Sequence, residues 1–356
     1  TMNCAHTQNP LTTKILSLLA VFLQYSLAIG CCFLFYLSEI AIPISNDILL
    51  CFVLDVIATG IIFFFSVIHN NSSIYDPYWS VQPLVIVFHL ITKYSAHNSV
   101  DAYSFRQWTI LIVVFYWGLR LTINWARWWP GFSVQDWRYD DLKSKTGKLY
   151  WIVSFFGIHM FPTVLVFLGC LPLWPAMLSP SSFSIWDILG IVITVGATTI
   201  EWIADEQLKR FQKRKKLGLN NDQDKIGLSF ANGRVLKFIT TGLWAYSRHP
   251  NYFGEISFWF GIYCFGVAGL SGDGNVSSNY FNGFVFFMLL GPIGMVLLFT
   301  LYSIPVNEKR NVSKREFYSE YVEKVSMLIP WKPLKGGSSE VIISEPDGSA
   351  DYGSGV

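Results

Sequence analysis

The stretch Phe284–Ile304 reads FVFFMLLGPIGMVLLFTLYSI and contains no charged side chain. A helix of this length spans about 30 Å, which matches the hydrocarbon thickness of a bilayer. Seven earlier stretches qualify or nearly qualify as further spans: Ile15–Leu37, Ile48–Ile68, Tyr78–Ile91, Trp108–Ile123, Trp151–Leu171, Ile185–Ile203 and Tyr252–Leu270. The stretch from Tyr78 is short and contains Pro83, so we expect it to be tilted, kinked or re-entrant. The pattern predicts an all-α, polytopic membrane bundle of about seven or eight transmembrane helices.

The composition agrees with a membrane protein. The 356 residues are 52% hydrophobic and only 14% charged, against about 25% charged in soluble domains. Their mean hydropathy is +0.39. This composition excludes an ordinary cytosolic enzyme, a disordered chain and a collagen-like chain. The net charge of +2 gives no reason to expect a nucleic-acid partner, and nothing in the sequence sets the oligomeric state.

Lys and Arg residues are distributed unevenly among the predicted loops. Most of them follow the fourth, sixth and eighth spans, whereas the loops after the fifth and seventh spans have none. Because cytoplasmic loops are enriched in Lys and Arg, this alternation predicts eight spans with both termini in the cytosol. If the third stretch does not cross, the N-terminus lies on the other side. We expect a membrane domain over residues 1–334 and a disordered Gly/Ser/acidic tail over residues 335–356.

The few charged residues inside or beside the spans are candidates for function, because burying them in a membrane is costly. Glu201, Asp205 and Lys209 are spaced four residues apart and share one helix face. Such a set can bind hydroxyl groups and an anion. The alternative is a ladder of salt bridges at the membrane interface.

A second group lies in the stretch TGLWAYSRHPNYFGE, residues 241–255. Pro250 suits the first turn of a helix, which places Asn251 and Glu255 on one face. Glu255 then lies one turn inside the span, where it needs a partner from a ligand or from a neighbouring helix. Tyr246, Arg248 and His249 complete this group.

A third group follows the last span, where Glu308 and Arg310 precede a short amphipathic helix with Tyr318 and Tyr321. Its alternative is a solvated helix face. Together the three groups predict a cytosolic pocket for a large, anionic, nucleotide-like cofactor, because Arg binds phosphate well. Neither a Rossmann fingerprint nor a P-loop is present. The six cysteines form no CxxC pair, so no metal site is indicated.

The run SRHPNYFGE, the upstream EWIAD and the later NEKR with YxxY resemble the C-terminal half of the steroid 5α-reductase-like membrane reductases. The resemblance is to a poorly characterised branch of that superfamily, covers roughly residues 50–332 and is strongest over residues 185–332. It implies a helical bundle in the endoplasmic reticulum that binds NADPH on its cytosolic side. The substrate would be a lipid-like alkene or enone that enters from the bilayer, and hydride would pass to one of its carbons.

By position, Asp205, Asn251 and Glu255 match cofactor-binding residues of that superfamily. Glu201 joins them by its spacing, and six further positions are weaker matches: Lys209, Tyr246, Arg248, His249, Glu308 and Arg310. Steroid 5α-reductases also use a Gln–Glu pair and a Tyr in their N-terminal half, and this pair is not found in the sequence.

We therefore take Tyr116, near Arg120, and Asp76 as the nearest candidates for catalysis. For Asp76 the alternative is a helix cap. Trp79 and Trp117 suit an interfacial aromatic belt.

Two other classes of protein remain open. Membrane methyltransferases of the isoprenylcysteine carboxyl methyltransferase type share the RHPxYxG pattern and bind S-adenosylmethionine in a similar pocket. A lipid-binding relative without turnover is the second alternative, motivated by the missing Gln–Glu pair. A transporter is disfavoured because the charged groups gather at one face rather than at the midplane of two related halves.

Overall fold

The computed structural model describes residues 10–38, 46–97, 105–178, 182–217, 236–271 and 278–332. Every regular element in these ranges is helical. The α-helices are α1 (Pro10–Tyr36), α2 (Asp47–Ile68), α3 (Tyr78–His97), α4 (Phe105–Trp128), α5 (Trp137–Thr146), α6 (Tyr150–Ser154), α7 (Phe161–Cys170), α8 (Leu173–Leu178), α9 (Ile185–Lys216), α10 (Pro250–Leu270), α11 (Ser278–Met288), α12 (Leu290–Leu298), α13 (Ile304–Lys314) and α14 (Tyr318–Lys324). Two π-helical segments, η4 (Phe155–Met160) and η8 (Phe299–Ser303), interrupt the runs α6–α7 and α12–α13.

Seven helical stretches of the described chain are long and apolar enough to cross a membrane. They are Leu11–Tyr36, Asp47–Ile68, Phe105–Trp128, Trp137–Leu178, Ile185–Lys216, Pro250–Leu270 and Gly283–Lys314. This result confirms the prediction of an all-α, polytopic membrane bundle. The predicted disordered tail lies outside the described residues.

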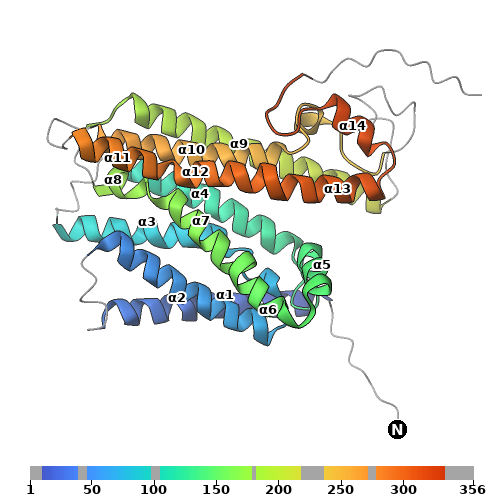
Figure 1. Ribbon diagram of the computed structural model, residues 1–356, viewed down its shortest axis with the longest axis horizontal. Helices are drawn as coiled ribbons and strands as arrows, with labels where there is room; N and C mark the ends of the chain where they lie inside the picture. The colour runs from blue at the N-terminus through green and yellow to red at the C-terminus, as the bar shows by residue number, and fades with distance from the viewer. Residues whose placement is uncertain are drawn as a thin grey trace, which may run out of the picture.

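The helix α3 corrects one expectation. The sequence predicts a short segment ending at Ile91 that is tilted, kinked or re-entrant, whereas α3 continues as one helix to His97 with Pro83 inside it. It packs beside α4 in the part of the bundle away from the basic residues (Figure 1). The helix α3 is not among the seven apolar stretches, and it carries polar side chains such as Ser80 and Gln82. These two side chains form hydrogen bonds with neighbouring helices.

The helices form two groups joined by α4 and α7. In one group α10 packs along α9 and against α8 and α12, and in the other α1 packs against α2 (Figure 1). The connecting helix α4 contacts both α3 and α9, whereas α7 contacts α2, α3 and α12. Polar groups on α4 can therefore reach either group.

Two glycines allow α10 to lie close to α9. A Cβ at Gly254 would overlap the Cγ of Glu201 and lie 2.8 Å from the main-chain oxygen of Ala197. A Cβ at Gly261 would lie 2.5 Å from the Cγ2 of Thr194. Since nothing larger than hydrogen fits at either position, the approach of the two helices depends on both.

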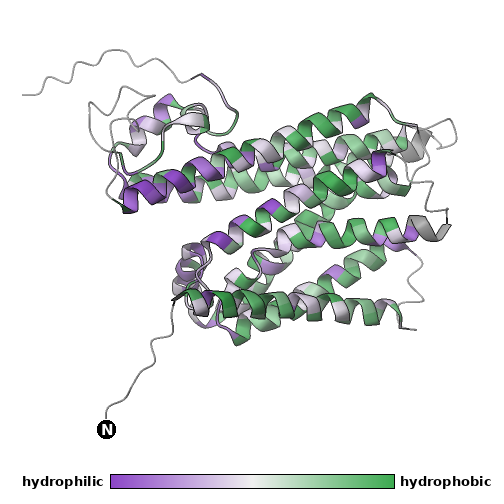
Figure 2. Cartoon of the chain, turned by 180° about the vertical axis from the view of Figure 1, so that it is seen from behind, coloured by the Kyte–Doolittle hydropathy of each residue, from purple (hydrophilic) through white to green (hydrophobic). Residues whose placement is uncertain are grey.

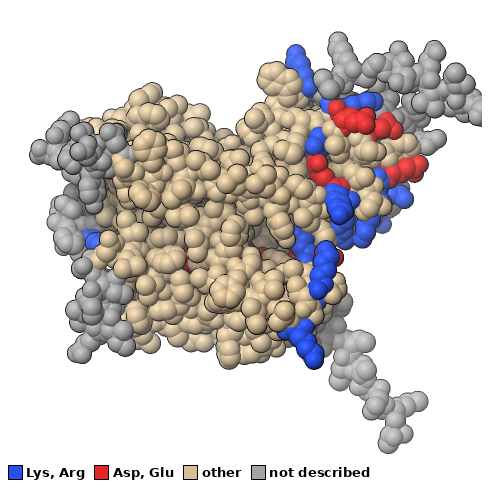
Figure 3. Space-filling view, viewed as in Figure 1, with Lys and Arg blue, Asp and Glu red and all other residues tan. Residues whose placement is uncertain are grey.

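Charged residues mark one end of the bundle. The hydrophilic residues of α5, α13 and α14 lie at this end, and most of the remaining helical surface is hydrophobic (Figure 2). The start of α1 is there too, because Lys14 donates to the main-chain oxygen of Arg127 at the end of α4. Figure 3 shows most of the Lys and Arg side chains of this face at the same end, which we call the basic end. The start of α1 and the last described helix, α14, thus lie at the same end of the bundle.

Candidate functional site

The guanidinium group of Arg120 is the centre of a buried polar cluster between α4, α9 and α10. It forms ion pairs with Glu201 and with Asp205, whose Oδ2 lies 2.9 Å from Nη1. The Arg120 side chain is 8% exposed and Glu201 is 2% exposed, whereas Asp205 is 17% exposed. The cluster therefore reaches solvent through Asp205, on the turn of α9 that lies nearer the basic end.

Two amide side chains hold Asp205 in place. Asn124 of α4 donates to its Oδ2 at 2.9 Å, and Asn251 of α10 donates to its Oδ1 at 3.4 Å. The helix α10 begins at Pro250, as the sequence predicts, so Asn251 and Glu255 project toward the same neighbours one turn apart. This geometry brings together four residues that the sequence singled out on α9 and α10.

Glu255 is 8% exposed and takes its partners from two indole groups. Trp117 of α4 donates to its Oε2 at 3.1 Å, and Trp259 of α10 donates to its Oε1 at 3.0 Å. A neighbouring helix thus supplies one of the partners that the buried carboxyl requires. Trp117 is fully buried and stacks on Phe258, with ring centroids 4.4 Å apart. The interfacial-belt interpretation of Trp117 is therefore wrong.

Two buried polar atoms of the cluster have no hydrogen-bond partner among the described residues, namely Oε1 of Glu201 and Nε of Arg120. A donor from a bound molecule would satisfy Oε1 of Glu201, since an ionised carboxylate only accepts hydrogen bonds. The cluster therefore has unused hydrogen-bonding capacity in its buried part.

Arg248 and His249 belong to a different set of contacts. Arg248 donates from Nε to Glu308 at 2.6 Å and from Nη1 to the main-chain oxygens of Val322 and Val325, and His249 Nε2 lies 3.1 Å from the same Glu308 carboxylate. These contacts tie the start of α10 to α13 and α14. The predicted short helix with Tyr318 and Tyr321 is α14, and both of its tyrosines are buried.

Three weaker candidates lie around this region. Lys209 follows Asp205 by one turn of α9 and is partly buried, and Tyr246 is 48% exposed. Arg310 of α13 lies over the ring of Trp137, with its guanidinium carbon 3.9 Å from the ring centroid. Figure 3 shows a hollow on this side of the molecule, with acidic atoms inside it and Lys and Arg atoms beside it.

Neither of the two residues expected to be catalytic forms a hydrogen bond with this cluster among the described residues. Tyr116 packs against the half-exposed Trp202 of α9, with ring centroids 6.1 Å apart. Asp76 precedes α3 and accepts a hydrogen bond of 2.6 Å from the hydroxyl of Tyr139 on α5. Burial raises the pKa of the Asp76 carboxyl from its usual 3.8 to about 7, although the Tyr139 hydrogen bond lowers it.

A second buried cluster, between α2 and α3, was missed from the sequence. Asp55 of α2 is 6% exposed, and it accepts hydrogen bonds from the Tyr78 hydroxyl at 2.6 Å and from the Gln82 amide. The sequence did contain a sign of this cluster, because Asp55 is a charged residue in the middle of an apolar span. A carboxyl, a glutamine and a tyrosine thus meet inside the bundle, on the face of α3 that turns away from α4.

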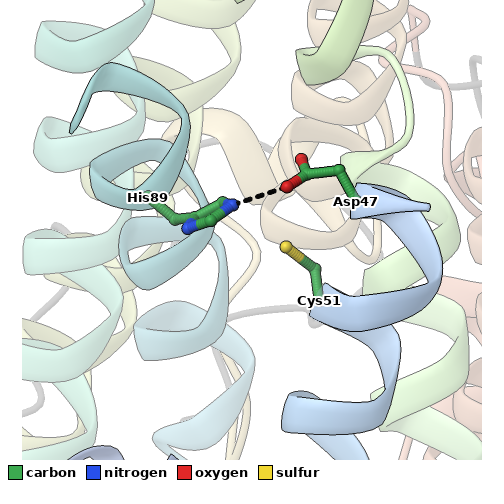
Figure 4. Close-up of side chains that lie close together, drawn as sticks. All are labelled: Asp47, Cys51 and His89. Carbon is green, nitrogen blue, oxygen red and sulfur yellow. Dashed lines mark hydrogen bonds and ion pairs between the residues drawn. The ribbon is translucent and has the colours of Figure 1, made fainter. Parts of the chain in front are cut away.

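A third group of polar residues lies at the end opposite the basic end. Asp47, Cys51 and His89 place their possible ligand atoms within 4.8 Å of one another (Figure 4). The Asp47 carboxylate already accepts from Lys93 at 2.8 Å and from the Trp174 indole at 2.8 Å, besides its 3.0 Å contact with His89. A cationic side chain thus stands beside the carboxylate that a metal would need.

Fold and clusters together define a polytopic membrane protein with polar sites inside its helical bundle. The chain belongs to the family described as Protein of unknown function (DUF1295), whose model matches residues 62–325. It is also similar to the Uncharacterized protein C594.04c of Schizosaccharomyces pombe (strain 972 / ATCC 24843), with 26% identity over 301 residues, which cover 81% of this chain and 80% of that protein. No solved structure matches the chain. The family match includes the whole α4–α9–α10 cluster and, from the α2–α3 cluster, Tyr78 and Gln82.

Proposed function

We propose that this protein is a membrane oxidoreductase that uses NADPH to reduce a C=C bond of a lipid-like substrate such as a steroid, a sterol, or an enoyl or polyprenoid lipid. One observation carries the proposal: the same bundle contains two buried polar clusters of different kinds. The α4–α9–α10 cluster is charged and reaches solvent, whereas the α2–α3 cluster has a single carboxyl group whose hydrogen-bond donors are neutral. Reduction of an alkene adds a hydride to one carbon and a proton to the other. It therefore needs a site for a hydride donor and a separate acid.

The charged cluster fits the cofactor that the sequence resemblance implies. Asp205 and Asn251 present a carboxylate and an amide at its more exposed edge, and Oε1 of Glu201 lacks a donor among the described residues. These groups would hold hydroxyl and amide groups of NADPH. Lys209 and Arg310 lie toward the basic end and would hold its phosphates. When bound, NADPH supplies the hydride.

Arg248, His249 and Glu308 have a different part in this proposal. The guanidinium group of Arg248 already bonds to Glu308 and to two main-chain oxygens of the α14 segment. We assign these three residues to holding α13 and α14 beside the start of α10, which keeps Asn251 and Glu255 in register with α9.

The α2–α3 cluster supplies the acid. The Tyr78 hydroxyl donates to Asp55 in this structure, and when substrate binds it would turn from that carboxyl and give its proton to the substrate carbon. Gln82 fixes the other oxygen of Asp55. The π bond of the alkene breaks, two C–H bonds form, and Tyr78 regains its proton afterwards. Tyr116 and Asp76 then have no role in the chemical step.

The location follows from the surface of the bundle and from the distribution of charge. Large apolar side chains cover the outside of the helices, so the protein sits in a membrane and a lipid would enter between helices. The basic end faces the cytosol by the positive-inside rule, which puts the cofactor site on that side. Residence in the endoplasmic reticulum rests on the resemblance alone.

Nucleotide binding by the purified protein tests the proposal. We expect NADPH to bind, S-adenosylmethionine not to bind, and Asp205→Ala to weaken NADPH binding by at least about tenfold, since a charged hydrogen bond contributes roughly 1.5–3 kcal/mol. Binding of S-adenosylmethionine without NADPH would identify a methyltransferase instead, as the RHPxYxG pattern allows. NADPH binding without lipid-dependent NADPH oxidation across a panel of sterols, enones and polyprenoids would favour a lipid-binding relative without turnover.

A further inference from the structure

Asp47, Cys51 and His89 lie at the end of the bundle opposite the basic end, and the proposed reaction uses none of them. Asp47 and Cys51 are one turn apart at the start of α2, and His89 faces them from α3 (Figure 4). Their possible ligand atoms all lie within 4.8 Å of one another. The Cys51 thiol is free and buried, whereas the side chains of Asp47 and His89 are 16% and 20% exposed. The group is therefore inside the bundle but within reach of water.

These three residue types are ligands that zinc prefers. A carboxylate oxygen, an imidazole nitrogen and a thiolate sulfur each bind Zn²⁺ at about 2.0–2.3 Å, so that ligand atoms at the corners of a tetrahedron lie about 3.3–3.8 Å apart. His89 Nε2 and Asp47 Oδ1 are already 3.0 Å apart. A movement of about 1 Å by the Cys51 sulfur would complete three corners, and water would take the fourth.

The Asp47 carboxylate is already held in an orientation that suits a ligand. Its Oδ2 accepts a hydrogen bond of 2.8 Å from the indole of Trp174 on α8, whereas its Oδ1 faces His89. Carboxylates that bind metal ions commonly accept such hydrogen bonds, and these partners change metal affinity by about 10–100-fold. A third helix therefore orients the oxygen that a metal ion would bind.

A cation already lies beside this oxygen. The ammonium of Lys93, one turn after His89 on α3, is 2.8 Å from Asp47 Oδ1. The Lys93 side chain is 37% exposed, so its ammonium can turn toward water when a metal ion takes its place. Binding of Zn²⁺ releases one proton from the Cys51 thiol to water. The thiolate and the carboxylate then balance the two charges of the ion, just as the ammonium balances the carboxylate alone.

We propose that Asp47, Cys51 and His89 form a zinc site that links α2 to α3, and that Lys93 and the metal ion alternate at the Asp47 carboxylate. The metal is Zn²⁺ rather than Ca²⁺ or Mg²⁺, because those two cations prefer oxygen ligands to a thiolate and an imidazole. Asp55 follows Cys51 by one turn of α2, so the ion would join the same two helices that form the α2–α3 cluster. Zinc binding requires neither NADPH nor a lipid substrate, and the site stands whether or not the protein is a reductase.

Metal binding to the purified, tag-free protein in lipid nanodiscs tests the site. The protein is first stripped with a chelator and then titrated with Zn²⁺ by calorimetry and with Co²⁺ as a spectroscopic probe. We expect one Zn²⁺ to bind per chain, and we expect Co²⁺ to give a thiolate-to-metal charge-transfer band together with the visible bands of a tetrahedral site. Zn²⁺ should also raise the Tm, because it binds the folded chain.

Three variants and a control assign the ligands. Cys51→Ala should abolish the charge-transfer band, and His89→Gln should raise the Kd for Zn²⁺ by at least about tenfold, since even the partners of ligands matter by this much. Lys93→Gln should lower that Kd by about threefold, because it removes a competing cation from a partly exposed ion pair. Cys264→Ala is the matched control, since Cys264 of α10 is 7% exposed and Cys51 is 6% exposed, and it should change neither the band nor the Kd.

A wild-type protein that binds no Zn²⁺ would overturn the site, and so would an unchanged Co²⁺ spectrum in folded Cys51→Ala. If Cys51→Ala does not fold, His89→Gln decides, and an unchanged Kd in that variant would equally remove the site. Weaker Zn²⁺ binding in Lys93→Gln would contradict the exchange between the ammonium and the metal ion.

Discussion

The α4–α9–α10 cluster and the α2–α3 cluster both contain buried carboxyl groups, but the partners of these carboxyl groups differ. In the first, Glu201 and Asp205 share the guanidinium of Arg120. In the second, Asp55 has a phenol and an amide as its described hydrogen-bond partners. Carboxyl groups held by a guanidinium suit the binding of hydroxyl and amide groups of a molecule that arrives from water, whereas neutral donors suit a place where a proton is transferred.

The largest expected effect is the loss of the shared cation. Arg120→Ala leaves two buried carboxylates without their counter-charge, which costs about 3–5 kcal/mol of folding free energy. Arg210→Ala is the matched control, because Arg210 is 75% exposed and forms a 3.5 Å surface pair with Glu206. Surface changes of this kind stay within about 0.5 kcal/mol. Unfolding of both variants in the same lipid or detergent measures the difference, and equal losses would mean that the cluster is not a buried ionic network.

The next effect is on turnover, and it should differ between Tyr78 and Tyr116. Tyr78→Phe removes the proposed acid of the α2–α3 cluster and should lower turnover by about 10²-fold or more, with NADPH affinity unchanged. Tyr116→Phe changes only the outer contact with Trp202 and should lower turnover far less. Steady-state NADPH oxidation with a lipid substrate measures both. The opposite ranking would move the proton donor to α4, where the sequence had placed it.

A smaller effect on stability is expected from adding a methyl group at a helix contact, and it should differ between α10 and α2. Gly254→Ala inserts a methyl group between α9 and α10, against Glu201 and the Ala197 main chain, and such overpacking costs about 1–3 kcal/mol. Gly60→Ala on α2 has no atom within 4 Å of the new methyl group and should be neutral or slightly stabilising. Thermal unfolding gives both values. Similar Tm values for the two variants would show that α10 can move away from α9 at little cost.

The smallest effect is a pH dependence at Asp76, which lies beside α3 near the basic end. Because folding raises its pKa from 3.8 to about 7, the protonated form is favoured in the folded state. Its contribution to stability is complete below about pH 4 and is lost as the pH rises to about 7. Asp76→Asn should therefore melt a few degrees higher than wild type at pH 8, and the gap should narrow toward pH 4. Asp141→Asn, at an exposed position, is the control; a pH-independent gap for Asp76→Asn would contradict the shift.

The sequence predicted those parts of the molecule that depend on local pattern. Apolar length located the spans, and Pro250 located the start of α10, so the shared face of Asn251 and Glu255 was predicted correctly. What lies opposite that face depends on how distant helices pack. No local pattern indicates that Trp117 turns inward to Glu255 rather than outward to lipid.

Asp55 shows a second reason why part of the site could not be predicted from the sequence. Its charge inside an apolar span was visible in the sequence, but its meaning depends on Tyr78 and Gln82, which come from a helix whose own pattern is weak. No adjacent pair along the chain marks this cluster, because its carboxyl and its amide belong to different helices. Contacts across helices are set by tertiary packing, so they could be found only in three dimensions.

One paired measurement tests the division of work between the two clusters most directly: NADPH affinity and lipid-dependent turnover in Asp205→Asn and Asp55→Asn. We expect Asp205→Asn to raise the Kd for NADPH by about tenfold or more, since it removes a charged acceptor. We expect Asp55→Asn to leave that Kd unchanged and to lower turnover sharply. A large rise in Kd for Asp55→Asn together with an unchanged Kd for Asp205→Asn would contradict the assignment of cofactor and acid to these two clusters.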